Sequence, residues 1–115
     1  MRVAVLSDIH GNLVALNAVL SDLEMDSVDQ ILCLGDVVVL GPQPQEVIAR
    51  LGALPPSIPF SLVMGNTDAW ALKPKPHPYR DEDTPYVNSI ELWSARQLSS
   101  DDLAYLATFQ PSIEV

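Results

Sequence analysis

The chain has 115 residues, 48% of them hydrophobic, and a formal net charge of −9 from 15 acidic and 6 basic side chains. This length fits a single domain, and the hydrophobic content is sufficient for a core. Such an acidic surface repels phosphate backbones, so the composition argues against general nucleic-acid binding.

The first half of the chain predicts alternating strands and helices. Residues 2–6 form a mainly apolar run with β-branched Val3 and Val5, which predicts a strand buried on both faces. Asn12 is the expected N-cap of a helix whose apolar stripe recurs every three or four residues. This stripe comprises Leu13, Leu16, Leu20 and Leu23. Residues 28–34 predict the second strand.

The apolar residues 37–40 follow that strand and are expected to point inward. Pro42 or Pro44 then begins a helix whose buried side is predicted to be Val47, Ile48 and Leu51, with Gly52 at C′. Residues 54–59, with three prolines, form a rigid connector, and residues 60–64 predict the third strand. The resulting β-α-β-α-β order predicts an α/β fold with a parallel sheet.

The second half begins with residues 73–86, which predict an irregular proline-rich loop. A helix follows, on which Trp93 is expected to be a core residue. Ser99 predicts a second N-cap, with Asp102 completing a capping box. After Pro111, residues 113–115 predict the beginning of another strand.

The sequence predicts a cytoplasmic protein. The single cysteine, Cys33, lies in an apolar run and cannot form an internal disulfide, so we expect a buried thiol in a reducing compartment. Asp8 and His10 interrupt the first apolar stretch, so no signal peptide is apparent. No apolar run is long enough to span a membrane.

Polar side chains follow each of the three predicted strands. Asp8 and His10 follow the first strand, Asp36 follows the second, and Asn66 follows the third. Ligands of parallel α/β sheets bind beyond the carboxyl ends of the strands, so we expect these side chains to meet. If the first loop is still extended, Asp8 and His10 point the same way because they are two residues apart. Carboxylate, imidazole and amide groups together suit a first-row transition metal.

Each of these short strings has an ordinary alternative. Asp-x-His can be a helix-capping acid followed by a surface histidine, while Gly-Asp and Gly-Asn are common turns. The three strings together, each directly after a buried strand, favour a metal or phosphate site.

The strings Ser7-Asp8-Ile9-His10-Gly11-Asn12, Leu34-Gly35-Asp36 with Gly41-Pro42, and Gly65-Asn66-Thr67-Asp68 resemble those of the calcineurin-like metallophosphoesterases. The resemblance is greatest to the small bacterial and archaeal phosphodiesterases. It implies the N-terminal half of a four-layer α/β/β/α sandwich with two divalent transition metals. Manganese is favoured over iron, zinc, nickel or cobalt.

The resemblance also implies roles for individual residues. Asp8 and His10 would bind one metal, Asn66 would bind the other, and Asp36 would bridge them. A water molecule between the metals would attack phosphorus. Asp36 and Asn66 are therefore also assigned to catalysis.

Two departures from the family pattern stand out. Many relatives have histidine after Gly-Asn, where it helps to protonate the leaving group, but this chain has Thr67. The family also takes further histidine ligands from a second half, whereas the only other histidine here is His77, expected in the exposed loop. We therefore expect residues 1–115 to be a truncated domain, or two copies to cover each other's open sheet.

The predicted function is hydrolysis of phosphoesters, more specifically diesters, of small phosphorylated molecules. The alternative is a non-catalytic fragment that binds metal or phosphate without the second half of the site. A third possibility is an interaction domain with a vestigial site. A dinucleotide-binding fold is disfavoured because no Gly-x-Gly-x-x-Gly follows the first strand.

Overall fold

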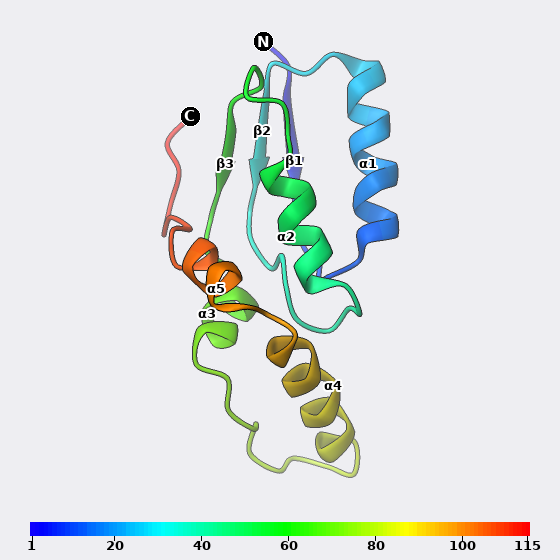
Figure 1. Cartoon of the computed structure of the whole chain (residues 1–115), viewed down its shortest axis with the longest axis vertical. Coiled ribbons are helices and arrows are strands. Elements are labelled where there is room, and N and C mark those ends of the chain that lie inside the picture. Colours follow the sequence, from blue (N-terminus) through cyan, green and yellow to red (C-terminus); the bar gives the residue numbers. More distant parts are fainter.

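The computed structural model describes residues 1–115, except for the side chain of Met25. One parallel sheet has the strand order β1-β2-β3, formed by β1 (Val3–Leu6), β2 (Gln30–Cys33) and β3 (Phe60–Leu62). The helices are α1 (Leu13–Asp26), α2 (Pro44–Gly52), α3 (Asn66–Leu72), α4 (Thr84–Arg96) and α5 (Ser100–Leu106). The predicted β-α-β-α-β order, followed by helices, is confirmed (Figure 1).

Three helices begin at the residues that local signals predict. The Asn12 side chain accepts a hydrogen bond from the backbone amide of Ala15 at 3.0 Å and so caps α1. Pro44 occupies the first turn of α2. Ser99 and Asp102 form a reciprocal capping box at α5, with bonds of 2.8 and 3.1 Å. These contacts satisfy amides that a helix leaves unpaired at its beginning.

The sheet is covered by helices on one face only. Figure 1 shows α1 and α2 packed side by side along the sheet. Ala4 is buried toward these helices, whereas the next residue, Val5, is 57% exposed because side chains alternate along a strand. Leu34 is also 50% exposed. The expectation that β1 is buried on both faces is therefore wrong: β1 is an edge strand with one open face.

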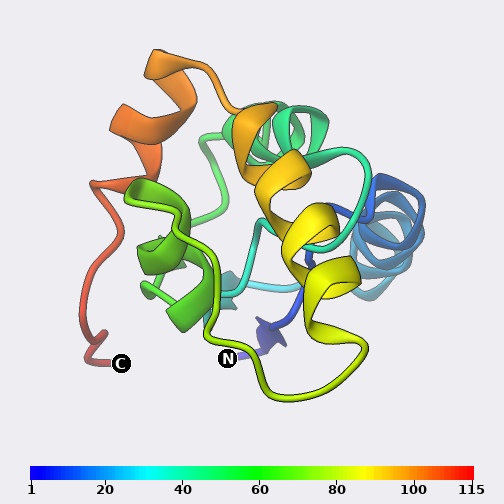
Figure 2. The ribbon, with the colours of Figure 1, turned by 90° about the horizontal axis from the view of Figure 1, so that it is seen from below.

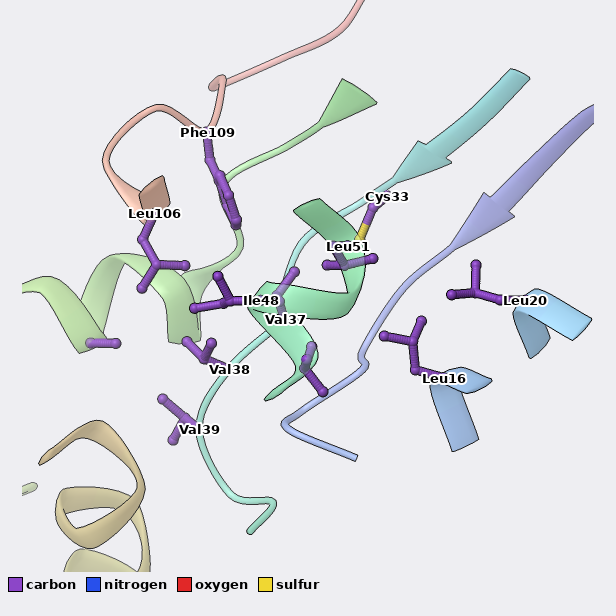
Figure 3. Packing of buried hydrophobic residues seen from close by; sticks show 12 residues of the cluster. Leu16, Leu20, Cys33, Val37, Val38, Val39, Ile48, Leu51, Leu106 and Phe109 are labelled. Atoms are coloured by element: carbon purple, nitrogen blue, oxygen red, sulfur yellow. The ribbon is translucent and has the colours of Figure 1, made fainter. Parts of the chain in front are cut away.

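The loop that follows β2 forms part of the hydrophobic core. Val37, Val38 and Val39 are at most 1% exposed and pack with residues of α2, together with Leu106 and Phe109 (Figure 3). This confirms the inward direction predicted for the loop, although Leu40 at its end is 45% exposed. A loop anchored by three buried valines holds the preceding residue, Asp36, in a defined position.

Several boundaries differ from those predicted. Gly52 is the last residue of α2, and Ala53 caps the helix with φ −94°, so Gly52 is not a left-handed C′ residue. Helix α3, which the sequence did not predict, begins directly after Gly65. The proline-rich loop ends before Thr84, because Pro85 lies in the first turn of α4, where proline is tolerated.

Helix α4 does not contribute Trp93 to the core. Trp93 is 48% exposed and Ile90 is 51% exposed, because α4 lies beyond the end of the sheet (Figure 1). Seen from that end, α4 is in the foreground (Figure 2). The predicted strand at residues 113–115 is also not formed, and one isolated bridge joins Val63 to Gln110. None of the helices in the described structure is long and apolar enough to cross a membrane.

Candidate metal centre

The candidate ligands meet at the carboxyl edge of the parallel sheet. Asp8 and His10 lie in the loop after β1, Asp36 lies in the loop after β2, and Asn66 begins α3 after β3. Asp8, His10 and Asp36 each offer a ligand atom, and these three atoms lie within 4.8 Å of one another. The structure therefore brings together side chains that are 28 residues apart in sequence, as the strand order predicts.

The backbone around these residues is not extended as expected. Asp8, His10 and Asp36 have φ angles of 57°, 48° and 56°, in the left-handed region that non-glycine residues rarely adopt. Hydrogen bonds between the two loops hold this geometry, from the Asp8 amide to the Gly35 carbonyl at 3.1 Å and from the His10 amide to the Asp36 carbonyl at 2.9 Å. Left-handed turns, rather than strand alternation, thus aim Asp8 and His10 at one point.

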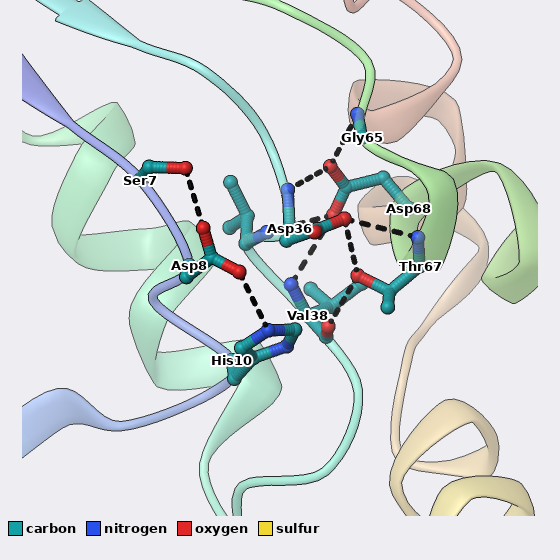
Figure 4. A network of polar contacts seen from close by, with 9 residues as sticks. Ser7, Asp8, His10, Asp36, Val38, Gly65, Thr67 and Asp68 are labelled. Carbon is teal, nitrogen blue, oxygen red and sulfur yellow. Dashed lines mark hydrogen bonds and ion pairs between the residues drawn. The ribbon is translucent and has the colours of Figure 1, made fainter.

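The Asp8 carboxylate is prepared for binding a cation. The Ser7 hydroxyl donates a hydrogen bond to Asp8 Oδ2 at 2.6 Å, and His10 Nε2 lies 3.3 Å from Asp8 Oδ1 (Figure 4). The hydrogen bond from Ser7 holds the pKa of Asp8 below its ordinary value, and His10 adds to this effect. Asp8 is therefore ionised at neutral pH, the state in which a carboxylate binds metal.

The His10 ring has one nitrogen that the protein leaves unsatisfied. Nδ1 is buried and has no hydrogen-bond partner among the residues that the structure describes. Buried polar atoms nearly always have a partner. A bound cation or an ordered water molecule would supply this one.

Asn66 lies directly against Asp36. One terminal atom of its amide group lies 3.2 Å from both carboxylate oxygens of Asp36. Because both neighbours are acceptors, the amide nitrogen belongs at this position and donates hydrogen bonds to both carboxylate oxygens of Asp36. The Asp8 and Asp36 carboxylates and the His10 imidazole form a donor set that fits a divalent transition metal.

Asp68 is a buried carboxylate that organises the loop carrying Asp36. Its two oxygens accept hydrogen bonds from the backbone amides of Asp36 (2.8 Å), Val37 (2.9 Å), Val38 (3.2 Å) and Gly65 (3.0 Å). Burial raises the pKa of Asp68, while the four amides oppose that shift by stabilising the ionised form.

Sequence reasoning did not assign a role to Asp68. A usable signal was present, because Asp68 stands three residues after Gly65, the spacing of a capping box. The backbone amides of residues 36–38 that bind Asp68 are about thirty positions away in the chain, so a local sequence pattern cannot predict these contacts.

Thr67 is turned toward Asp36 rather than toward solvent. Its backbone amide and its hydroxyl lie 3.1 and 3.0 Å from Asp36 Oδ1, and the hydroxyl also lies 3.1 Å from the Val38 carbonyl. The hydroxyl proton therefore has two protein acceptors within hydrogen-bond distance. Thr67 orients the Asp36 carboxylate.

His77 is exposed, as predicted, but its ring is not free. The ring stacks on Trp70 with centroids 5.5 Å apart and an interplanar angle of 13°. Its Nε2 atom pairs with the Glu91 carboxylate of α4. His77, Trp70 and Glu91 line one pocket together with Val39, Asn66 and Thr67. Trp70 thus stands beside the candidate site.

Known proteins show the same architecture. The model of the calcineurin-like phosphoesterase family matches residues 1–110. A metallophosphoesterase of Sphaerobacter thermophilus is 38% identical, with a TM-score of 0.69 over 95% of this chain and 41% of its own. A protein provisionally described as a diadenosine tetraphosphatase is 27% identical, with a TM-score of 0.64 over 94% of this chain and 42% of its own.

A curated relative matches nearly the whole chain. The uncharacterized protein MJ0912 of Methanocaldococcus jannaschii is 34% identical over 112 residues, which are 97% of this chain and 43% of that protein. The chain thus spans less than half the length of the relatives it matches, and its architecture matches the N-terminal part of a metallophosphoesterase fold. By its sequence and its fold, the chain belongs to the calcineurin-like phosphoesterase family of metal-dependent phosphoesterases.

Proposed function

We propose that this chain hydrolyses phosphodiesters of small molecules at a two-metal site built from Asp8, His10, Asp36 and Asn66. The observation that carries the proposal is the convergence of ligand atoms from Asp8, His10 and Asp36 within 4.8 Å at the sheet edge. This compact set of oxygen and nitrogen donors suits a divalent transition metal. Among manganese, iron, zinc, nickel and cobalt, the resemblance to the family favours manganese.

Each residue has a proposed task. Asp8 and His10 would hold one cation, and Asn66 would hold the other. Asp36 would contribute to both, since it belongs to the cluster with Asp8 and His10 and also lies against Asn66. When bound, a pair of divalent cations supplies charge for the phosphoryl oxygens and hydroxide near neutral pH.

The preference for diesters has two supports. A diester carries one negative charge at neutral pH, which suits a chain with a net charge of −9 better than a doubly charged monoester. The second support is similarity to a protein provisionally described as a diadenosine tetraphosphatase, a description that names a small phosphorylated molecule.

Metal binding and turnover test the proposal together. We expect isothermal titration to show Mn²⁺ binding that Asp36→Asn abolishes, and Mn²⁺-dependent hydrolysis of bis(4-nitrophenyl) phosphate that the same change removes. Asp22→Asn, on the exposed side of α1, is the matched control because it removes the same charge far from the site. Turnover that survives Asp36→Asn would exclude the assigned site.

A non-catalytic metal or phosphate binder is the second candidate. It is favoured by the small donor set, since His10 is the one histidine among the described residues that joins the cluster. Binding of one Mn²⁺ with no hydrolysis of the nitrophenyl diester would support this candidate over the first.

The open sheet face suggests self-association. Val5 of β1 and Leu34, directly after β2, are both half-exposed. We propose that a second copy covers this face and that the protein acts in the cytoplasm, where the buried Cys33 thiol stays reduced. Light scattering that shows a monomer at all concentrations would exclude the dimer.

A further inference from the structure

The pocket beside the candidate metal centre contains a histidine with no assigned role. This pocket of about 180 Å³ is lined by Asn66, Thr67 and Trp70 of α3, and also by His77 and Glu91. Asn66 lies directly against Asp36, so the pocket adjoins the candidate metal centre. A substrate bound at that centre could extend one ester group toward His77.

Thr67 cannot supply a proton to that ester group. Its hydroxyl lies 3.0 Å from Asp36 Oδ1 and 3.1 Å from the Val38 carbonyl, so its only proton is used within the protein. A threonine hydroxyl is also too weak an acid to protonate a leaving group near neutral pH. A different donor is needed for substrates with poor leaving groups.

His77 is the one imidazole lining this pocket, and it is held in place from three directions. Trp70 stacks on the ring, Glu91 pairs with Nε2, and Asn88 binds the His77 backbone amide at 2.8 Å and the carbonyl at 3.2 Å. The Glu91 side chain is 15% exposed, so this pair is partly shielded from water. Orientation of an imidazole by a carboxylate is how proteins fix which ring nitrogen faces a substrate.

We infer that His77 is the general acid that donates a proton to the leaving-group oxygen, and that Glu91 is its positioning residue. This inference rests on the proposed phosphodiesterase activity. The charged groups around His77 are Glu91 from α4 and, in the same loop, Arg80, Asp81 and Asp83, which line a neighbouring pocket. Helix α3 contributes the neutral ring of Trp70.

The step balances without any further reactant. An oxygen from water forms a bond to phosphorus while the bond from phosphorus to the leaving oxygen breaks, with its electron pair. The protonated His77 ring gives its proton to that oxygen, so the leaving group departs as a neutral alcohol. Water loses one proton to solvent, and the neutral ring takes one back.

The dependence of rate on the leaving group tests this role. Methyl phenyl phosphate releases phenolate, a poor leaving group. For this substrate we expect His77→Gln to lower kcat/KM by about 10²- to 10⁴-fold. For methyl 4-nitrophenyl phosphate the loss is smaller, because nitrophenolate needs little protonation. Glu91→Gln should show the same selectivity with smaller losses, and Tyr79→Ala, a 72% exposed neighbour, serves as the control. Equal losses on both esters would overturn the role of His77 and leave the phosphodiesterase proposal standing.

Imidazole NMR provides a readout that does not depend on turnover. The chain has two histidines, so the side-chain ¹H–¹⁵N spectrum reports on His10 and His77 alone. We expect Zn²⁺ to shift the His10 signals and leave those of His77 in place, and dimethyl phosphate added to the Zn²⁺-loaded protein to shift His77. A shift of His77 with Zn²⁺ alone would make it a metal ligand and overturn the inference. Failure of the wild type to hydrolyse either ester would overturn the proposed function and, with it, this role.

Discussion

Asp68 Oδ2 accepts a hydrogen bond from the backbone amide of Asp36 at 2.8 Å, so one buried carboxylate holds the loop that carries another. Its oxygens also bind the amides of Val37, Val38 and Gly65, which joins the loop after β2 to the beginning of α3. The candidate ligands on these two segments, Asp36 and Asn66, are therefore positioned relative to each other by a residue that does not touch the predicted metals.

Replacing Asp68 by asparagine should destabilise the fold. The amide NH₂ group would face backbone N–H donors and leave buried groups unsatisfied, at a cost of about 1–3 kcal/mol for each. Urea unfolding followed by circular dichroism in EDTA measures this loss without any contribution from metal. Asp22→Asn, on an exposed helix surface, is the control and should change little. Equal stability of the two variants would show that the contacts of Asp68 are dispensable.

Two glycines should respond oppositely to alanine. Gly35 has φ 100°, and a Cβ there would lie 2.4 Å from the Gly65 backbone nitrogen. Gly35→Ala should therefore force the loop after β2 away from the segment after β3 and destabilise the protein. Gly52 lies at the end of α2, and a Cβ there meets nothing within 4 Å. Gly52→Ala should therefore stabilise the protein by about 0.5–1 kcal/mol. Thermal unfolding of both variants tests this contrast, which fails if Gly35→Ala is the more stable of the two.

Thr67→Val should weaken metal binding without removing it. Valine keeps the shape and the backbone amide bond to Asp36 but loses the hydroxyl that lies 3.0 Å from Oδ1. Loss of a group that orients a metal ligand typically costs 10–100-fold in affinity. Titration with Mn²⁺ measures the change, and Thr108→Val, whose exposed hydroxyl bonds only the Tyr105 carbonyl at 2.6 Å, is the control. An unchanged affinity for Thr67→Val would argue against Asp36 as a ligand.

Cys33 should make stability fall in alkaline solution. Burial raises the pKa of its thiol from 9.0 to about 11. Between these values the thiol ionises in the unfolded chain but not in the folded one, so the free energy of unfolding drops by up to about 1.4 kcal/mol per pH unit. The stability is fully present below pH 9 and is lost as the pH rises toward 11.

Cys33→Ala isolates this contribution. The variant loses packing at every pH, but its stability should decline less steeply between pH 9 and 11 than that of the wild type. Burial also raises the pKa of Tyr105, so part of the alkaline decline remains in the variant. Parallel urea titrations at four pH values give the two slopes, and identical slopes would refute the assignment to Cys33.

Much of the architecture could be predicted because its signals are local. Asn12, Pro44 and Ser99 mark helix beginnings within one turn, and each occupies the predicted position. The three strands were predicted from short apolar runs, and the rule that ligands gather beyond their carboxyl ends brought Asp8 and Asp36 together.

Local sequence signals gave wrong predictions where the packing of distant segments determines the burial or direction of a side chain. Trp93 has the spacing of a core residue, yet it is half-exposed because α4 lies beyond the sheet. The side chains of Asp8 and His10 point to the same place because both residues have left-handed backbone conformations, which hydrogen bonds to the loop after β2 hold. Alternation along a strand is not the cause.

The sequence by itself determined the order of the elements, the helix caps and the residue types at the strand ends, since each depends on neighbours a few positions away. Tertiary structure alone decided which side chains meet across the chain. Asp68 reaches amides some thirty residues away, and His77 pairs with Glu91 fourteen residues on. Such contacts form only when the segments pack together, because they are stabilised cooperatively by the burial of many residues across the fold.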